Sequence, residues 1–158
     1  MRIAFGSDHA GFQLKQDLAA HARALGHEVT DVGTHSTDSV DYPNFAFLVA
    51  ESVARGAHDL GVLVCGSGLG MSIAANKVPG VRAAVCQETY TARMAREHND
   101  ANVLCLGQRV VGIGLATDIL DTFLRTPFSQ GANHRRRLDE IAHYERASRE
   151  PEVPRGEP

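Results

Sequence analysis

The sequence predicts an α/β protein, a three-layer α/β/α sandwich built on a five-stranded parallel sheet. Short apolar runs rich in β-branched residues alternate with longer segments in which apolar residues recur at helical spacing. Strands separated by helices in this way form parallel βαβ units, with helices on both faces of the sheet. The chain has 158 residues, 43% of them hydrophobic, which suits one domain with a sizeable core. We expect that domain to span residues 1–147.

The expected strands and helices alternate regularly along the chain. The expected strands are Ile3–Phe5, His27–Val32, Leu60–Val64, Val81–Val85 and Asn102–Leu106. The expected helices are Ala10–Leu25, Asn44–Arg55, Ser72–Lys77, Thr89–His98, Gly112–Arg125 and His134–Arg146. In the first of these helices, Leu14, Leu18, Ala22 and Leu25 share one face, and Lys15 is expected on another. Residues 148–158 hold three prolines and five charges of mixed sign, which predicts a flexible tail.

Composition excludes several classes of protein. The formal net charge of -3 gives no general attraction to nucleic acid or to anionic membranes. The sequence contains no apolar run long enough to span a bilayer, and its first residues do not resemble a signal peptide. Three cysteines without a pairing pattern predict free thiols in a reducing compartment, and scattered histidines predict no metal site. We therefore expect a cytoplasmic protein that needs no metal.

The most informative segment is LGVLVCGSGLGMSIAANK at residues 60–77. A buried strand runs into Cys65, a glycine-rich loop follows at Gly66–Gly70, and a helix then begins. Backbone N–H groups of such a loop and helix start converge on one point and favour negative charge there. A thiol beside a helix N-terminus is favoured as the thiolate, its reactive form. Cys65 is therefore a candidate base or nucleophile, whereas Cys86 and Cys105 are expected to be structural.

Two common phosphate-binding motifs do not fit this loop. Its spacing is Gly-x-Gly-x-Gly, and Met71 stands where a dinucleotide fingerprint of the Rossmann type needs its third glycine. The loop also follows the third strand, although the expected sheet is Rossmann-like. A P-loop is excluded because no Gly-Lys-Ser/Thr follows. A tight turn without a ligand remains the alternative interpretation.

Other polar residues follow the strands at the edge where open α/β sheets bind ligands. Asp8 and His9 come after the first strand, and Arg109 comes after the fifth. Asp8 has the alternative role of capping the helix that begins near Ala10. His98 lies at a helix end, where a histidine often caps carbonyl groups.

The last expected helix opens with the basic cluster Asn133–Arg137, with the sequence NHRRR. A solvated charged face is the simplest explanation of this cluster. The fixed fork of an arginine also fits a phosphate dianion. One or two of these arginines, or Arg109, are therefore candidates to hold a phosphorylated small molecule.

Five motifs occur along the chain in a specific order: IAFGSDHAGFQLK at 3–15, DYP at 41–43, GVLVCGSGLGMSIAANK at 61–77, REHNDANVL at 96–104 and GQRVVG at 107–112. Together they resemble the type B ribose-5-phosphate isomerases over about residues 2–146. That superfamily also contains isomerases of galactose 6-phosphate and of other phosphorylated sugars. The resemblance implies a cofactor-free aldose–ketose isomerase of the pentose phosphate pathway. It also implies a homodimer or a dimer of dimers in which two subunits complete each active site.

The resemblance implies roles for the matching residues. Cys65 would move a proton between C1 and C2 of ribose 5-phosphate or ribulose 5-phosphate through an enediolate. Ser67 would assist opening of the furanose ring, and Asp8 would handle protons on the sugar oxygens. The enediolate oxygen would be held by backbone amides of Gly66, Gly68, Leu69 and Gly70.

Further residues would bind the substrate or come from the second subunit. His98 of the partner subunit would assist ring opening, and Asn99 of the partner chain would bind the sugar. His9, Arg109 and Arg137 would contact the phosphate or the neighbouring hydroxyls.

This chain differs from many members of the family at two positions, one related to the catalytic base and one to the substrate. One branch of the family has a glutamate base where this chain has Met71, so this chain should depend on Cys65. Many members have an arginine of the phosphate site where this chain has Asn133. Either Arg135 or Arg136 compensates, or the substrate is another phosphorylated sugar, such as a tetrulose, allose or galactose phosphate.

The sequence thus leaves three hypotheses: an isomerase of ribose 5-phosphate, an isomerase of another phosphorylated sugar, and a non-catalytic phosphate- or nucleotide-binding module.

Overall fold

Five parallel strands form the central sheet of this computed structural model, which describes residues 1–149. The strand order is β2-β1-β3-β5-β4, with all neighbours parallel. The strands are β1 (Arg2–Ser7), β2 (Glu28–Asp31), β3 (Leu60–Cys65), β4 (Ala83–Val85) and β5 (Val103–Gly107). The predicted fold class is therefore confirmed.

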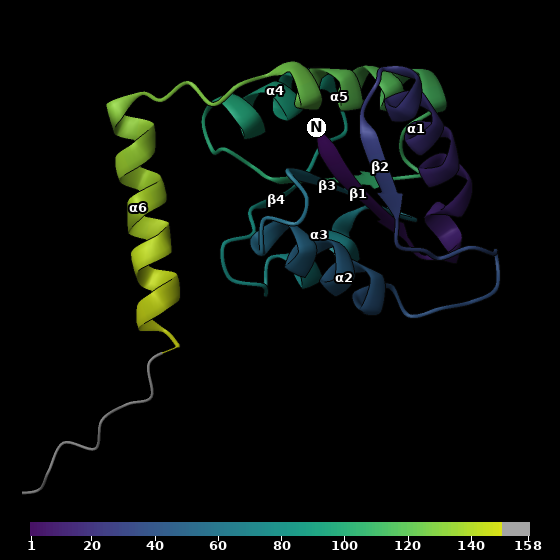
Figure 1. The fold of residues 1–158 in the computed structure, drawn as a ribbon, viewed down its shortest axis with the longest axis horizontal. Helices are drawn as coiled ribbons and strands as arrows, with labels where there is room; N and C mark the ends of the chain where they lie inside the picture. Colours follow the sequence, from purple (N-terminus) through teal and green to yellow (C-terminus); the bar gives the residue numbers. More distant parts are fainter. Residues whose placement is uncertain (150–158) are drawn as a thin grey trace, which may run out of the picture. The chain divides into compact units, whose positions relative to one another are not determined.

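Helices cover both faces of this sheet, as Figure 1 shows. One face packs against α1 (Phe12–Ala24), α4 (Thr89–Glu97) and α5 (Ile113–Arg125). The other face packs against α2 (Tyr42–Ala54) and α3 (Leu69–Ala75). Successive residues of a strand point to opposite faces. Val62 and Val64 of β3 therefore belong to the core under α1, α4 and α5, whereas Leu63 and Cys65 belong to the core under α2 and α3. Cys65 is therefore placed on the α2 and α3 side by strand periodicity.

The strand order brings three strand ends together. β1, β3 and β5 occupy the centre of the sheet, whereas β2 and β4 are its edges. The register pairs Ser7 with Val64 and Cys65 with Gly107, so the three central strands end at the same level. The segments that follow these strands are therefore neighbours, at the edge where open α/β sheets bind ligands.

Two glycines allow the chain segments at this edge to approach closely. Gly11 lies in the 3-10 helix η1 (His9–Gly11), and a Cβ atom there would lie 2.4 Å from the backbone carbon and oxygen of Val64. A Cβ atom on Gly107 would lie 2.7–2.8 Å from backbone atoms of Ser67. Real side chains do not fit at these separations, so both contacts require glycine.

The third helix differs from its sequence prediction. It was expected to begin at Ser72 but begins at Leu69, directly after Gly68. Gly68 has a φ of +81°, a left-handed conformation that turns the chain within one residue. The loop is therefore limited to residues 66–68, and Leu69 and Gly70 belong to the first helical turn.

Lys15 also differs from its prediction, because its side chain is fully buried. Its Nζ atom lies 2.5 Å and 2.6 Å from the two carboxylate oxygens of Asp31, and it donates to the carbonyl of Thr34 at 2.8 Å. These partners lie at the end of β2 and in the loop after it, which helical spacing alone does not reveal. Leu25, expected on the apolar face, is 43% exposed because α1 ends before it.

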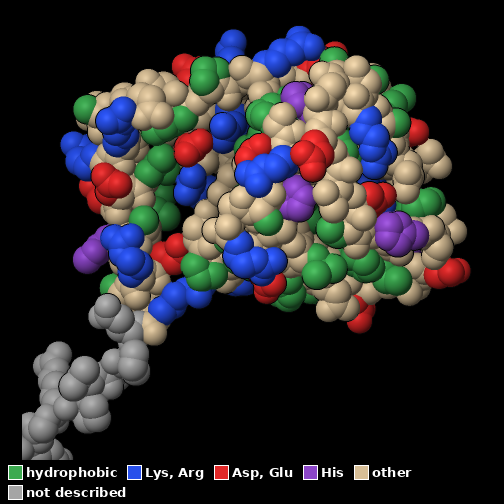
Figure 2. All heavy atoms as spheres, viewed as in Figure 1, with side chains coloured by type: hydrophobic (Ala, Val, Ile, Leu, Met, Phe, Trp, Pro, Cys, Tyr) green, Lys and Arg blue, Asp and Glu red, His purple; other side chains and the backbone are tan. Residues whose placement is uncertain are grey.

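The described chain divides into two units, Met1–Phe128 and a second that begins at Ser129. The second contains α6 (Ala132–Ala147), none of whose residues is buried. Apart from Ser148 and Arg149, the predicted tail lies outside the described residues. None of the helices in residues 1–149 has the length and apolar character needed to cross a membrane. On the face shown in Figure 2, basic and acidic side chains are interspersed.

The close approach at Gly11 predicts a large loss of stability in Gly11→Ala. Because backbone atoms of β3 cannot yield to a side chain, we expect the free energy of unfolding to fall by about 3 kcal/mol, the upper end of typical overpacking costs. Urea denaturation measures this change. Gly114→Ala is the control, since Gly114 is an exposed residue of α5 with open space around it. That change should stabilise the protein by no more than about 1 kcal/mol. Equal stability of Gly11→Ala and wild type would contradict the packing described above.

Candidate active site

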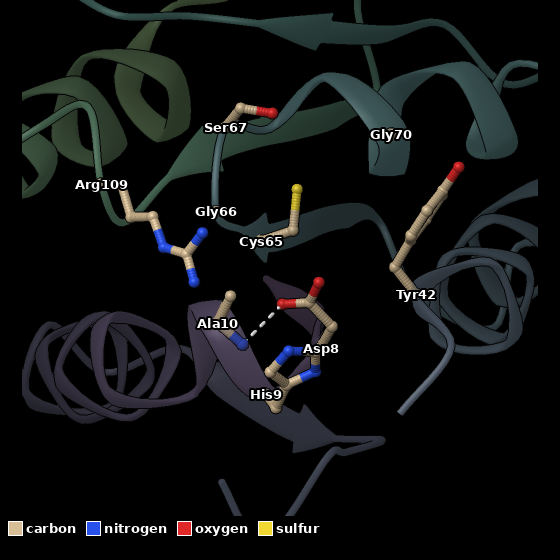
Figure 3. Close-up of a pocket in the computed structure, with 9 residues that line it drawn as sticks. All are labelled: Asp8, His9, Ala10, Tyr42, Cys65, Gly66, Ser67, Gly70 and Arg109. Carbon is tan, nitrogen blue, oxygen red and sulfur yellow. Dashed lines mark hydrogen bonds between the residues drawn. The ribbon is translucent and has the colours of Figure 1, made fainter. Parts of the chain in front are cut away.

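A pocket of about 430 Å³ lies at the ends of the central strands (Figure 3). Three sequence segments that follow β1, β3 and β5 line it, together with the first residue of α2. The lining residues are Asp8, His9, Ala10, Tyr42, Cys65, Gly66, Ser67, Gly70 and Arg109. The pocket therefore combines a thiol, a carboxylate, an imidazole, a guanidinium and two hydroxyl groups.

Cys65 is the last residue of β3, and its sulfur lies at the wall of this pocket. The backbone N–H of Gly68 donates to Sγ at 3.1 Å. This N–H therefore points from the glycine-rich loop back to the end of β3. The residue is 5% exposed, so the sulfur can reach a bound molecule while little of it contacts solvent. Geometry thus places a potential proton acceptor beside a backbone donor.

The other two cysteines have a different environment. Burial raises the pKa of the Cys86 thiol to about 11, and it raises the pKa of Cys105 well above its ordinary value. Both thiols are therefore neutral at physiological pH. Neither residue lines the pocket, which supports the structural role expected for them.

Asp8 both caps a helix and faces the pocket. Its Oδ1 atom accepts hydrogen bonds from the backbone N–H groups of Ala10 at 2.9 Å and Gly11 at 3.0 Å. This is the capping role that the sequence left open. In Figure 3 the second carboxylate oxygen points towards the side of the pocket where Cys65 lies. The cap therefore fixes the carboxylate while one oxygen remains directed at the cavity.

Arg109 brings positive charge to the part of the pocket wall beside Gly66. Its backbone N–H donates to the carbonyl of Gly66 at 3.1 Å, which ties the segment after β5 to the loop after β3. A Cβ atom on Gly66 would lie 3.6 Å from Cδ and Nη1 of Arg109, so the guanidinium group lies close over this glycine. An arginine so placed can form paired hydrogen bonds with a phosphate or a carboxylate.

Only some residues of the glycine-rich segment 66–70 line the pocket. Ser67 lines the pocket, and its Oγ accepts from the N–H of Leu69 at 3.4 Å. Gly66 and Gly70 also line the pocket, whereas Gly68 and Leu69 do not. The N–H of Gly68 is already directed at the sulfur, and the Leu69 side chain is 57% exposed.

Tyr42 is a lining residue to which the sequence analysis gave no role. A Cβ atom on Gly70 would lie 2.8 Å from Cζ of Tyr42, so the ring lies directly against this glycine. The DYP motif at 41–43 was the available signal, but it does not indicate which strand ends lie near it. Only the packing of α2 against α3 brings the ring to the pocket.

His98 and Asn99 do not line the pocket of their own chain. His98 follows α4 as its C-cap, and its Nε2 lies 3.9 Å from Oε1 of Glu97. The turn that carries both residues is held by Arg82, which donates to the carbonyls of Asn99 at 3.0 Å and Asp100 at 2.8 Å. These residues are therefore presented on a fixed turn elsewhere on the first unit.

The basic cluster lies in the second unit. Asn133, Arg135, Arg136 and Arg137 are all residues of α6, and each is assigned to that unit alone. Among the described residues, no group of three or more histidine, cysteine, aspartate or glutamate side chains is arranged to hold a metal ion.

Comparisons with known proteins agree with one another. The sequence profile of the Ribose/Galactose Isomerase family matches residues 3–141. Ribose-5-phosphate isomerase B of Escherichia coli is 49% identical over 144 residues, which cover 91% of this chain and 96% of the relative. The structure of ribose-5-phosphate isomerase B from Clostridium thermocellum superposes with a TM-score of 0.92 at 54% identity, covering 94% of this chain and 99% of that one. A structure of the Mycoplasma genitalium enzyme with bound ribulose 5-phosphate has a TM-score of 0.88 at 44% identity, with coverage of 92% and 96%.

Proposed function

This chain belongs to the ribose/galactose isomerase family, and on that premise we propose that it interconverts ribose 5-phosphate and ribulose 5-phosphate without a cofactor. The observation that carries the proposal is the position of Cys65 Sγ, which lies at the pocket wall 3.1 Å from the Gly68 amide. A sulfur base beside a carboxylate and an arginine suits removal of a proton next to a sugar carbonyl. The named activity of the relatives supports the same reaction.

The proposed chemistry is a proton transfer through an enediolate. The thiolate of Cys65 takes the proton from C2 of the open-chain aldose, and the electron pair of that bond forms the C1–C2 double bond. Negative charge develops on O1. Asp8 relays a proton between O2 and O1, and the Cys65 thiol returns its proton to C1 to give the ketose. The aldose and the ketose have the same composition and the same overall oxidation state, so the reaction needs no external oxidant or reductant.

The oxyanion needs hydrogen-bond donors that are in place before the reaction. The first N–H groups of a helix have no partners within it, and α3 begins at Leu69 beside the pocket. We assign the backbone amides of Gly66 and Gly70 to the developing charge, since both residues line the cavity. One well-placed donor contributes about 3 kcal/mol to the stability of the transition state.

The phosphate end of the substrate requires positive charge and N–H donors. Arg109 and His9 line the pocket on the side away from Gly70 in Figure 3. We assign both to the phosphate or the neighbouring hydroxyls, and we propose Arg137 of α6 as a further contact. The structure with bound ribulose 5-phosphate is that of a relative, and it supports a sugar phosphate of this size as the ligand.

We also propose that two subunits complete each site, with His98 and Asn99 supplied by a partner. Exposed apolar side chains support a second copy on the face formed by α2 and α3. Leu69 is 57% exposed and Ile73 is 62% exposed, one turn apart on α3 beside Gly70. Leu48 of α2 is 50% exposed. Apolar groups exposed beside a polar pocket are typical of an interface.

An isomerase of another phosphorylated sugar is the second candidate, because Asn133 replaces an expected arginine of the phosphate site. Values of kcat/KM for ribose, tetrulose, allose and galactose phosphates separate the two candidates. We expect the highest value for ribose 5-phosphate. A preference for one of the other sugars would replace our first candidate with the second. Binding of adenosine nucleotides without turnover of any sugar would support a phosphate-binding module instead.

The Cys65→Ala variant should lose the reaction while the fold persists. Removing the base should lower kcat by about 10²–10⁴-fold, the usual contribution of general acid–base catalysis. In D₂O, wild-type protein should introduce deuterium at C1 or C2 of the product, and the variant should not. Cys86→Ala is the matched control, because that thiol is neutral and lies outside the pocket. Near-normal turnover by Cys65→Ala would show that another group is the base.

Mixed dimers test whether the active site is shared. Cys65→Ala and His98→Asn should each be inactive as homodimers. When they are unfolded together in equal amounts and refolded, half the dimers carry one chain of each kind. In a shared site, one of the two sites in each mixed dimer is intact, so roughly a quarter of wild-type activity should return. No recovery, with mixed dimers confirmed by mass spectrometry, would place His98 outside the partner's site.

A further inference from the structure

One ring nitrogen of the pocket residue His9 accepts a hydrogen bond from a distant part of the chain. The backbone N–H of Val40 donates to Nδ1 of His9 at 3.2 Å, although 31 positions separate the two residues. A ring nitrogen that accepts a hydrogen bond carries no proton. A neutral His9 with this bond therefore has its proton on Nε2, and an imidazolium could not make the bond at all.

Val40 belongs to the segment 33–41, which joins β2 to α2 and is called here the 33–41 loop. Its start is tied to β1: the N–H of Ser7 donates to the Gly33 carbonyl at 2.7 Å, and the N–H of Thr34 donates to the Ser7 carbonyl at 2.8 Å. Gly33 also packs against α2, since a Cβ atom on it would lie 2.8 Å from the Phe45 ring. The first residues of the loop are therefore fixed relative to β1 and α2.

A buried ion pair also holds the first residues of the 33–41 loop in place. Lys15 is fully buried and donates to both carboxylate oxygens of Asp31 and to the carbonyl of Thr34. Asp31 Oδ1 also accepts from the N–H of Gly33 at 2.9 Å. A buried ammonium without these partners would be strongly unfavourable. The ion pair thus favours one path for the first residues of the loop.

The other end of the loop is fixed at the pocket itself. Val40 lies two residues before Tyr42, whose ring packs on Gly70. The loop is consequently anchored on both sides of the amide that meets His9.

We infer that the 33–41 loop is a positioning element that holds His9 as the Nε2–H tautomer, with this N–H available to donate to an anionic group in the pocket. In this role His9 binds the phosphate or a hydroxyl oxygen as a neutral donor and does not accept a proton from the substrate. Val40 is the positioning residue, and it acts through its backbone N–H. The inference rests on the proposed function for the identity of the anion.

The tautomer can be observed directly. In protein labelled with ¹⁵N, long-range ¹H–¹⁵N spectra distinguish a protonated ring nitrogen from an accepting one, and His9→Gln assigns the signals. We expect the Nε2–H form in the wild-type protein, and we expect inorganic phosphate to shift the Nε2 signal. An Nδ1–H form or an imidazolium at neutral pH would overturn the inference, whatever reaction the protein catalyses.

Val40→Pro removes the donor, and Val40→Ala is its matched control because it keeps the N–H. Loss of the anchor frees the ring to rotate, so we expect Val40→Pro to raise KM for ribose 5-phosphate by roughly two- to tenfold, the cost of ordering one side chain on binding. The value of kcat should change less than KM, since phosphate binding is common to substrate and transition state. Equal KM values for the two variants would overturn the inference.

A third substitution separates binding from proton transfer. His9→Gln keeps an N–H donor but cannot act as a base, so it should retain more activity than His9→Ala. Equal loss in both variants would contradict a donor role. If the wild-type protein shows the Nε2–H form and the phosphate-induced shift but isomerises no sugar phosphate, the proposed function fails and the positioning role remains.

Discussion

The close contact between the ends of β1, β3 and β5 is the constraint on which the site depends. Gly11 lies against the backbone of Val64, and Gly107 lies against the backbone of Ser67. These contacts hold the segments after the three strands within a few ångströms of each other. A carboxylate, a thiol and a guanidinium group from distant parts of the sequence therefore line one cavity. Any side chain at either glycine would separate them.

Backbone N–H groups hold three of the side chains in that cavity in place. Gly68 directs its N–H at the sulfur of Cys65, and Asp8 uses one oxygen as a cap while the other faces the cavity. His9 receives the Val40 amide on one nitrogen. In each case a backbone group fixes the side chain before a ligand arrives. Preorganisation of this kind is what stabilisation of a developing oxyanion requires.

The site could be predicted from the sequence only in part, for physical reasons. Cys65, Gly66, Ser67, Gly70, Asp8, His9 and Arg109 were all identified from their positions after strands, and all of them line the pocket. The sequence predicts no role for Tyr42, because its ring reaches the pocket only through packing on Gly70. Helical spacing places Lys15 on a face other than the apolar one, and it does not show that Asp31 and Thr34 lie beside that side chain. The roles of three further residues remain proposals, because none of them lines the pocket of the first unit: His98, Asn99 and Arg137.

The sequence by itself determined the number and kind of the strands and helices, and which residue types follow each strand. These features depend on local periodicity, glycine positions and turn chemistry, which are encoded within short windows. Tertiary structure alone decided the strand order β2-β1-β3-β5-β4, the burial of Lys15 and the hydrogen bond from the Val40 amide to Nδ1 of His9. Each of these depends on a partner many residues away. Pairing over such distances is set by packing of the whole sheet, which no local pattern contains.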